Sequence, residues 1–168
     1  MIELRRATPG DADWLVELLN DEDVDPFLGP RRPRDDAEML AEIERSSTQP
    51  DVYGQLVIEA DGERAGAVAY SRDSEPNRIA HVGGLAIHPS FRGRRIADEA
   101  ARLLQRYLIF ELGFHRLELA CYGFNERAIA HAERAGWVRE GVKRRAYQRH
   151  GEWQDAVQFA LLREDLDP

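Results

Sequence analysis

The sequence predicts an α+β domain in which helices flank a mixed, mostly antiparallel central sheet. Two periodicities support this class: alternating apolar residues are typical of strands, and apolar residues at every third or fourth position are typical of amphipathic helices. Along the chain, segments of the two kinds follow the order βααβββαβαββ. The 168 residues contain no internal repeat, low-complexity run or linker, so we expect one domain over residues 1–168.

The first part of the chain predicts one strand and two helices. A strand is expected over residues 2–7, and a helix over residues 9–20 carries Trp14, Leu15, Leu18 and Leu19 on one side. An irregular acidic and Pro-rich segment, residues 21–34, precedes a second helix over residues 35–45.

Three antiparallel strands are expected next, over residues 52–60, 64–71 and 79–88. Asp61-Gly62 is a typical two-residue hairpin turn, and residues 72–77 form a longer second connection. Gly83-Gly84 predicts a bulge in the third of these strands, because glycine inside a strand pattern often marks one.

The basic turn that follows these strands is the most informative part of the sequence. Arg92, Arg94 and Arg95 lie immediately before a helix that begins at Ile96. The first N–H groups of a helix have no intrahelical partner, and an exposed cation is disfavoured there by roughly 0.3–1 kcal/mol. Three arginines at this position therefore indicate a bound anion such as a phosphate. A solvated basic turn is the alternative.

The helix that begins at Ile96 is amphipathic. Its polar face is expected to carry Arg102, Gln105 and Arg106, and its apolar face Ile96, Ala100, Leu103, Leu104, Tyr107 and Leu108.

The rest of the chain predicts a strand, a helix and a hairpin. Gly113 supplies a left-handed cap before a strand over residues 115–122, in which the single cysteine, Cys121, is expected to be a small core residue. Asn125 opens a helix that Gly136 closes. Strands over residues 138–148 and 156–162 are joined by a turn at residues 149–152.

Taken in order, these motifs resemble one enzyme family. The chain carries Leu-Ala-Ile-His-Pro at 85–89, Arg-Gly-Arg-x-Ile-Ala at 92–97, Asn-x-Arg-Ala-Ile at 125–129 and Ala-Gly-Trp at 135–137. This arrangement resembles the GNAT superfamily of acetyl-CoA-dependent N-acetyltransferases. The opening Ile-Glu-Leu-Arg-Arg-Ala-Thr-Pro-Gly-Asp-Ala and the late Gly-Glu-Trp-Gln-Asp resemble the branch that includes ribosomal-protein N-terminal acetyltransferases.

The resemblance implies acetyl-CoA as the cosubstrate and assigns residues to it. The turn and helix start would hold the pyrophosphate, and the backbone of the preceding strand would pair with the pantetheine arm. Asn125 would contact the cofactor, with a plain N-cap as its alternative role. The implied cofactor-binding residues are Leu85, Ala86, Ile87, Arg92, Gly93, Arg94, Arg95, Ile96, Ala97 and Asn125.

Two positions depart from the family pattern. The family places a glycine where this chain has Arg95, which puts the affinity for the cofactor in question. Many members carry a tyrosine at the position of Ala132, where it protonates the departing thiolate. Tyr122 or Tyr147 could substitute, although we expect both to pack in the core, and the thiolate could also leave unaided or take a proton from water.

His81 is the candidate general base. Some family members carry a glutamate at this position, and a neutral imidazole with an ordinary pKa of about 6.5 can accept a proton from an ammonium group. A structural strand histidine is the alternative. The histidines show no metal-ligand spacing with one another or with Cys121, so no metal is expected.

Composition limits the partners. The net charge of −8 argues against a nucleic-acid-binding protein and suits a cationic acceptor such as a peptide N-terminus, a polyamine or an amino-sugar. Asp21, Glu22, Asp23 and Asp25 could attract that amine, or could form a solvated acidic loop.

Localisation and the class of protein are also expectations. No segment suggests a membrane partner or a signal peptide, and one cysteine excludes an internal disulfide, so a cytoplasmic protein is expected. The oligomeric state, including a homodimer, stays open. So does a noncatalytic acyl-CoA-binding or regulatory module as the alternative to an enzyme.

Overall fold

The computed structural model describes residues 1–166 and confirms the predicted order of elements. The last two residues of the expected domain lie outside the described part. The strands are β1 Ile2–Arg6, β2 Tyr53–Ala60, β3 Glu63–Ser74, β4 Ile79–Ile87, β5 Arg116–Tyr122, β6 Val138–Arg149 and β7 Glu152–Leu162. The helices are α1 Ala12–Leu19, α2 Asp36–Thr48, α3 Ile96–Arg106 and α4 Glu126–Arg134.

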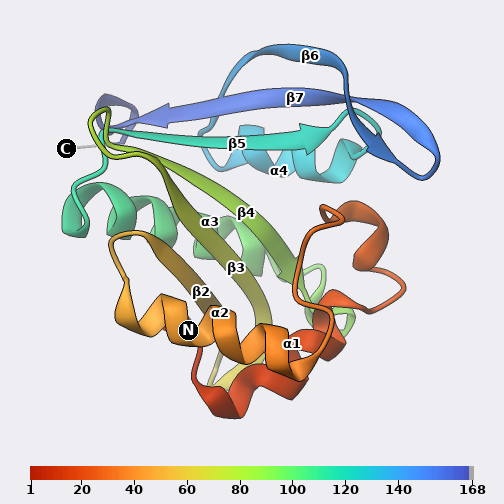
Figure 1. Cartoon of the computed structure of the whole chain (residues 1–168). Coiled ribbons are helices and arrows are strands. Elements are labelled where there is room, and N and C mark those ends of the chain that lie inside the picture. The colour runs from red at the N-terminus through yellow and green to blue at the C-terminus, as the bar shows by residue number, and fades with distance from the viewer. Residues whose placement is uncertain (167–168) are drawn as a thin grey trace.

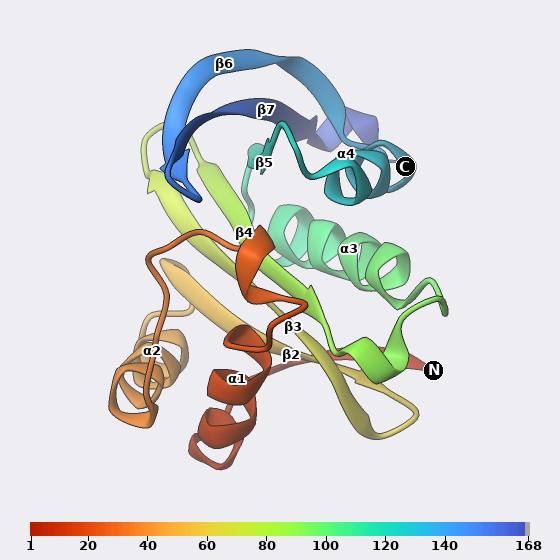
Figure 2. The same cartoon turned by 90° about the vertical axis from the view of Figure 1, so that its right-hand side faces the viewer.

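The strands form one sheet in the order β1-β2-β3-β4-β5-β7-β6, shown in Figure 1. Helices α1 and α2 lie on one side of it and α3 and α4 on the other (Figure 2). Alternation along the strands supplies a separate core to each side. Leu15, Met39 and Ile43 pack with Val57 on the α1 and α2 side. The larger core on the other side contains Tyr70, Ile96, Leu104, Phe114, Leu117 and Phe159.

Strands β4 and β5 are paired at one end of the sheet and separated at the other. All pairings are antiparallel except that of β4 with β5, which is parallel and joins only three residue pairs, from Ile79–Arg116 to His81–Glu118. Beyond His81 the two strands separate, as Figure 1 shows. The second half of β4 therefore has β3 on one edge and no strand on the other.

The predicted bulge in β4 is confirmed. Ala67 and Ala69 of β3 pair with Ala86 and Gly83, so three steps along β4 match two along β3. Gly84 adopts a φ of +64°, which a glycine reaches without strain. The bulge lies where β4 leaves β5, and a bulge increases the local twist of its strand.

Helix α3 differs from the predicted amphipathic pattern at two positions. Gln105, expected on the polar face, is buried, and its amide donates a hydrogen bond of 2.9 Å to the carbonyl of Ala135. That carbonyl lies at the end of α4, where backbone oxygens lack intrahelical partners. Leu103, expected in the core, is exposed. The α-helix ends at Arg106 and continues as a π-helical turn, Tyr107–Glu111, before the left-handed Gly113.

The last hairpin also differs from the prediction. The expected four-residue turn contains only two turn residues, His150 and Gly151, both with positive φ, and β7 begins at Glu152 rather than at residue 156. This geometry is typical of a tight hairpin connection. The other predicted tight turn, Asp61-Gly62, is confirmed, with φ angles of 51° and 84°.

Candidate functional site

A cleft of about 1040 Å³ lies where β4 and β5 separate. A second cavity, of about 600 Å³, lies beside the turn between β4 and α3. Leu85, Asn125 and His131 line both, so we describe them as the inner and outer parts of one site. Residues 21–34, which we call the strap, contribute Phe27 and Leu28 to both parts.

The free edge of β4 lies between the two parts. Leu85, Ala86 and Ile87 line the outer cavity, and their segment pairs only with β3. A Cβ added at Gly66 would lie 2.4 Å from the carbonyl oxygen of Ala86, so β3 packs very closely against this segment. Such packing holds the backbone firmly and leaves its other edge available for hydrogen bonds from a ligand.

The arginines of the predicted turn have different surroundings. Arg92 donates a 3.0 Å hydrogen bond to the carbonyl of Asp23 in the strap. Arg94 lies over the ring of Phe91, 5.2 Å from its centroid, whereas Arg95 lines the outer cavity together with Gly93, Ile96 and Ala97. The structure thus brings Arg92 and Arg95 to the cavity and places Arg94 on Phe91.

Arg95 adopts the backbone conformation that a glycine would take. Its φ of 56° and ψ of 24° are left-handed, and it is the residue that precedes α3. A non-glycine residue in this region costs on the order of 1 kcal/mol. The departure from the family pattern therefore keeps the shape of the turn and adds an exposed guanidinium to it.

The predicted cap role of Asn125 is confirmed, because its side-chain oxygen accepts a hydrogen bond from the N–H of Ala128 at 3.2 Å. Asn125 also lines both parts of the site, so it can cap α4 and still contact a ligand in the cavity.

Sequence reasoning missed a basic stripe on α4. Arg127, His131 and Arg134, spaced i, i+4 and i+7, line the outer cavity. Buried Asp98 of α3 accepts hydrogen bonds from His131 at 2.8 Å and from Arg134 at 3.3 Å. Burial acts to raise the pKa of Asp98, but hydrogen bonds from Arg134 and His131 outweigh it and hold that pKa below its usual range. The i, i+4 and i+7 spacing of these three basic residues was the sequence signal that could have predicted the stripe.

His81 lies on the face of the sheet that carries α1 and α2. It is half-buried, lines the inner cleft and pairs across the sheet with Ser71, which pairs with Tyr53. A Cβ added at Gly83 would lie 3.5 Å from Nε2 of His81, which shows that the imidazole ring extends along the strand toward Gly83. The imidazole therefore lies next to the bulge, where β4 becomes free.

The inner cleft has a polar wall that the sequence did not predict. Helix α2 contributes Glu38 and Glu42, and β2 contributes Tyr53 and Gln55. Burial, and then the neighbouring Glu42, raise the pKa of Tyr53 well above its usual range, so its hydroxyl stays neutral.

The tyrosine expectations are partly wrong. Tyr147 is 43% exposed and lines the cleft rather than packing in the core. Tyr122 is half-buried, with its ring edge-on to that of Tyr147 at a centroid distance of 6.5 Å. Ala132 is buried and also lines the cleft, without a hydroxyl.

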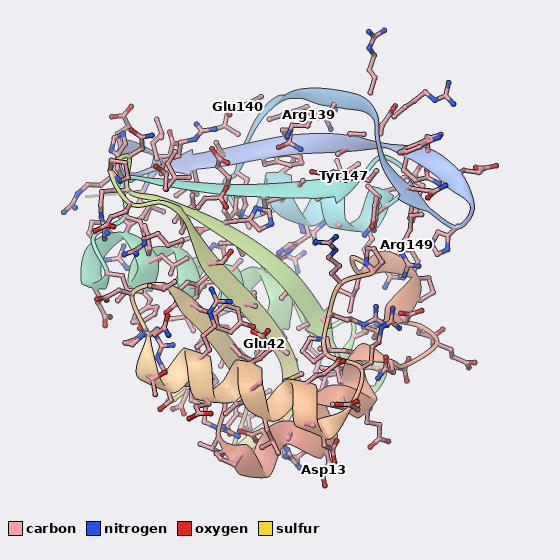
Figure 3. The ribbon with its side chains drawn as sticks, viewed as in Figure 1. Asp13, Glu42, Arg139, Glu140, Tyr147 and Arg149 are labelled. Carbon is pink, nitrogen blue, oxygen red and sulfur yellow. The ribbon has the colours of Figure 1, made fainter. Side chains whose placement is uncertain are left out.

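The acidic strap is not a free cluster of four carboxylates. Asp25 is ion-paired with Arg32 and lies 3.8 Å from Arg149, so its charge is neutralised locally. Arg149 also donates to the carbonyls of Leu28 at 3.1 Å and Asp25 at 2.6 Å, and His150 contacts the carbonyl of Pro26 at 2.8 Å. These bonds fasten the strap to the tip of the β6–β7 hairpin (Figure 3).

Cys121 is buried, as predicted, and burial raises the pKa of its thiol to about 11. A thiol that stays protonated is a poor nucleophile. Residues 1–166 contain no group of three or more histidine, cysteine or acidic side chains that could hold a metal ion. In the same residues, no helix has the length and apolar character needed to cross a bilayer.

Comparisons with known proteins find one family and structures of the same fold. Residues 2–138 match the model of the acetyltransferase (GNAT) domain family. The putative ribosomal N-acetyltransferase YdaF of Bacillus subtilis is 29% identical, over 99% of this chain and 93% of its own length. Spermidine N(1)-acetyltransferase of Escherichia coli K12 is 28% identical over 64% of this chain and 58% of its length. A crystal structure of a probable acetyltransferase superposes with a TM-score of 0.83 at 26% identity, covering 98% of this chain and 94% of that one.

Proposed function

This chain belongs to the GNAT family of acetyltransferases, and we propose that it acetylates a primary amine, either a peptide N-terminus or a small cationic amine, by direct attack of that amine on the thioester. The general reaction of the family is transfer of an acetyl group from acetyl-CoA to an amine. The protein is accordingly an acetyl-CoA-dependent acyltransferase, which favours an enzyme over a noncatalytic acyl-CoA-binding module.

The outer cavity has the chemistry that a coenzyme diphosphate requires. Free N–H groups at the start of α3 and the side chains of Arg92 and Arg95 would hold the diphosphate. The free edge of Leu85, Ala86 and Ile87 would pair with the amide groups of the pantetheine arm. The acyl end of acetyl-CoA would then reach the inner cleft near the bulge, with Asn125 beside it.

His81 would prepare the acceptor. An ammonium group cannot attack a carbonyl until it loses a proton, and the imidazole next to the bulge can take it directly or through one water. The amine nitrogen then bonds to the acetyl carbon, the carbon–sulfur bond breaks, and the second proton that the nitrogen loses passes to water. A backbone N–H of the free β4 segment would donate to the developing oxyanion.

No hydroxyl group at position 132 is available to protonate the leaving thiolate, because that residue is Ala132. We propose that the thiolate leaves as the anion or takes its proton from water. Tyr122 and Tyr147 line the same cleft and are the other available donors.

One observation carries this proposal: a single strand, β4, places His81, a free backbone edge and the basic turn in succession along one cleft. Calorimetry should show that acetyl-CoA binds to the protein. A panel of amines should then stimulate release of free CoA. Binding without CoA release from any amine would support the noncatalytic alternative, and no binding would contradict both.

A further inference from the structure

We propose that the acceptor carries a second positive charge, which Glu42 of α2 binds at the inner end of the cleft. The inference rests on the proposed acetyl transfer and narrows its substrate class to diamines and polyamines. The reacting nitrogen would lie near His81 and the second ammonium group near Glu42.

Glu42 is unusual among the carboxylates of this protein. Five others that are shielded from solvent each have an arginine partner, namely Asp11, Asp25, Glu59, Asp98 and Glu118, and a sixth, Asp21, accepts a 2.8 Å hydrogen bond from the backbone N–H of Asp23. Glu42 is half-buried and lines the cleft, yet no ion pair involves it within residues 1–166. Figure 3 shows it on the side of α2 that faces the strands. A shielded charge is costly unless it is paired, so this carboxylate is suited to a cationic ligand.

The neighbours of Glu42 supply further polar groups. The neutral hydroxyl of Tyr53 lies beside it, and the guanidinium of Arg45 stacks over the ring of Tyr53 at 4.7 Å without pairing with Glu42. The stacked arginine holds the phenol in place. An ammonium group has three N–H donors, and the Glu42 carboxylate and the Tyr53 oxygen can accept two of them.

Gln55 provides an independent indication of a ligand. Its side chain is only 5% exposed and lines the cleft, and its oxygen accepts a 3.4 Å hydrogen bond from Tyr53. Its amide nitrogen has no partner among the described residues. The nitrogen is not among the enclosed side-chain atoms that lack a partner, so it is open to the cleft and can donate a hydrogen bond to a bound molecule or its water. Because a carboxamide can turn to present oxygen or nitrogen, Gln55 can take either role beside an ammonium group.

The register of the sheet sets the expected length of the acceptor. Tyr53, Ser71 and His81 are directly paired neighbours on β2, β3 and β4. Adjacent strands are about 4.8 Å apart, so the two ends of this row are separated by roughly 10 Å. The acceptor should therefore have its two ammonium groups about that far apart, as in an extended diaminooctane.

The test compares diaminooctane with octylamine, which has the same chain and one charge fewer. We expect kcat/KM of the wild type to favour the diamine by roughly 10- to 100-fold, the value of a charge-assisted hydrogen bond. Glu42→Gln should abolish that preference and change octylamine turnover less than about twofold. Glu44→Gln, the same charge change on the exposed side of α2, should retain the preference. Equal thermal stability of the variants excludes misfolding.

The proposal is overturned if the wild type shows no preference, or if Glu42→Gln slows both amines equally. Faster turnover of a neutral peptide N-terminus than of diaminooctane would also overturn it. If no amine releases CoA, the proposed function fails separately. Calorimetry with diaminooctane then decides the present inference, which requires binding that Glu42→Gln weakens and Glu44→Gln does not.

Discussion

The two halves of the sheet differ in how they are covered. We call β1 to β4 the closed half, and β5, β7 and β6 the open half. Strands β1 to β4 are packed on both faces, with α1 and α2 on one side and α3 on the other. Strands β5, β7 and β6 have α4 on one face, while β6 is exposed along nearly its whole length, including Val138 and Val142. Only three residue pairs of β4 and β5 connect the halves.

This difference separates stability from function within one sheet. Strand β4 stays paired with β3 on both sides of its bulge, while β5, β7 and β6 stand away from it, so a cleft forms beside the bulge. Residues at the cleft can be polar and incompletely partnered because the closed half supplies the packing. Substitutions in the two halves should therefore have different consequences.

The largest effect is expected at the cleft, from His81→Gln. Loss of a general base typically slows a reaction roughly 100- to 10,000-fold, so kcat/KM should fall by that amount while the midpoint of thermal unfolding stays the same. His115→Gln, on an exposed histidine, is the control. Wild-type activity in His81→Gln would show that the amine loses its proton to solvent instead.

In the closed half, Gly54→Ala should reduce stability. A Cβ at Gly54 would lie 2.0 Å from the ring of Tyr70, which is held by a 2.7 Å hydrogen bond to the carbonyl of Pro50. Overpacking of this kind costs about 3 kcal/mol. Gly83→Ala at the cleft, where the nearest atom is 3.5 Å away, should cost less than about 1 kcal/mol. Chemical denaturation measures both, and equal losses would contradict the comparison.

The stability of the protein should depend on pH through Asp11, which packs against the closed half of the sheet. Hydrogen bonds from Arg5, at 2.6 Å and 2.9 Å, hold the pKa of buried Asp11 well below its usual range. Because the folded pKa is lower than the unfolded value, this stabilisation is present above about pH 4 and is lost as the pH falls.

Asp11→Asn should accordingly lower the free energy of unfolding by about 2 kcal/mol at neutral pH, with a smaller difference from the wild type below about pH 4. Asp13→Asn, on an exposed residue of α1, should change little. A difference that is constant with pH would show that the ion pair is not the cause.

The smallest effect is expected where the strap bridges the two halves. Arg149→Ala removes hydrogen bonds to the carbonyls of Asp25 and Leu28, worth about 1 kcal/mol. The looser strap should raise KM for the acceptor by roughly 3- to 10-fold and leave kcat within about twofold. Arg144→Ala, on the exposed strand β6, should change neither. Steady-state kinetics with a fixed saturating acetyl-CoA concentration distinguishes the two variants.

Much of the fold was predictable because its signals are local. The order of elements, the Asp61-Gly62 turn, the Asn125 cap and the left-handed Gly113 depend on residues close together in the sequence. The basic turn and the His81 strand were also found in this way. Gln105 and Leu103 were assigned to the wrong faces of α3, because the packing of α4 against that helix decides which side is buried.

By itself, the sequence determined the order of the elements, the basic turn before Ile96 and the family resemblance, since each is encoded by neighbouring residues. Only the tertiary structure decided that Asp25 is neutralised, that Tyr147 faces the cleft and that Glu42, Tyr53 and Gln55 form its inner wall. These groups come from elements far apart in the chain. Their proximity follows from the pairing of β2, β3 and β4 and from the packing of α2 over them, which no local pattern encodes.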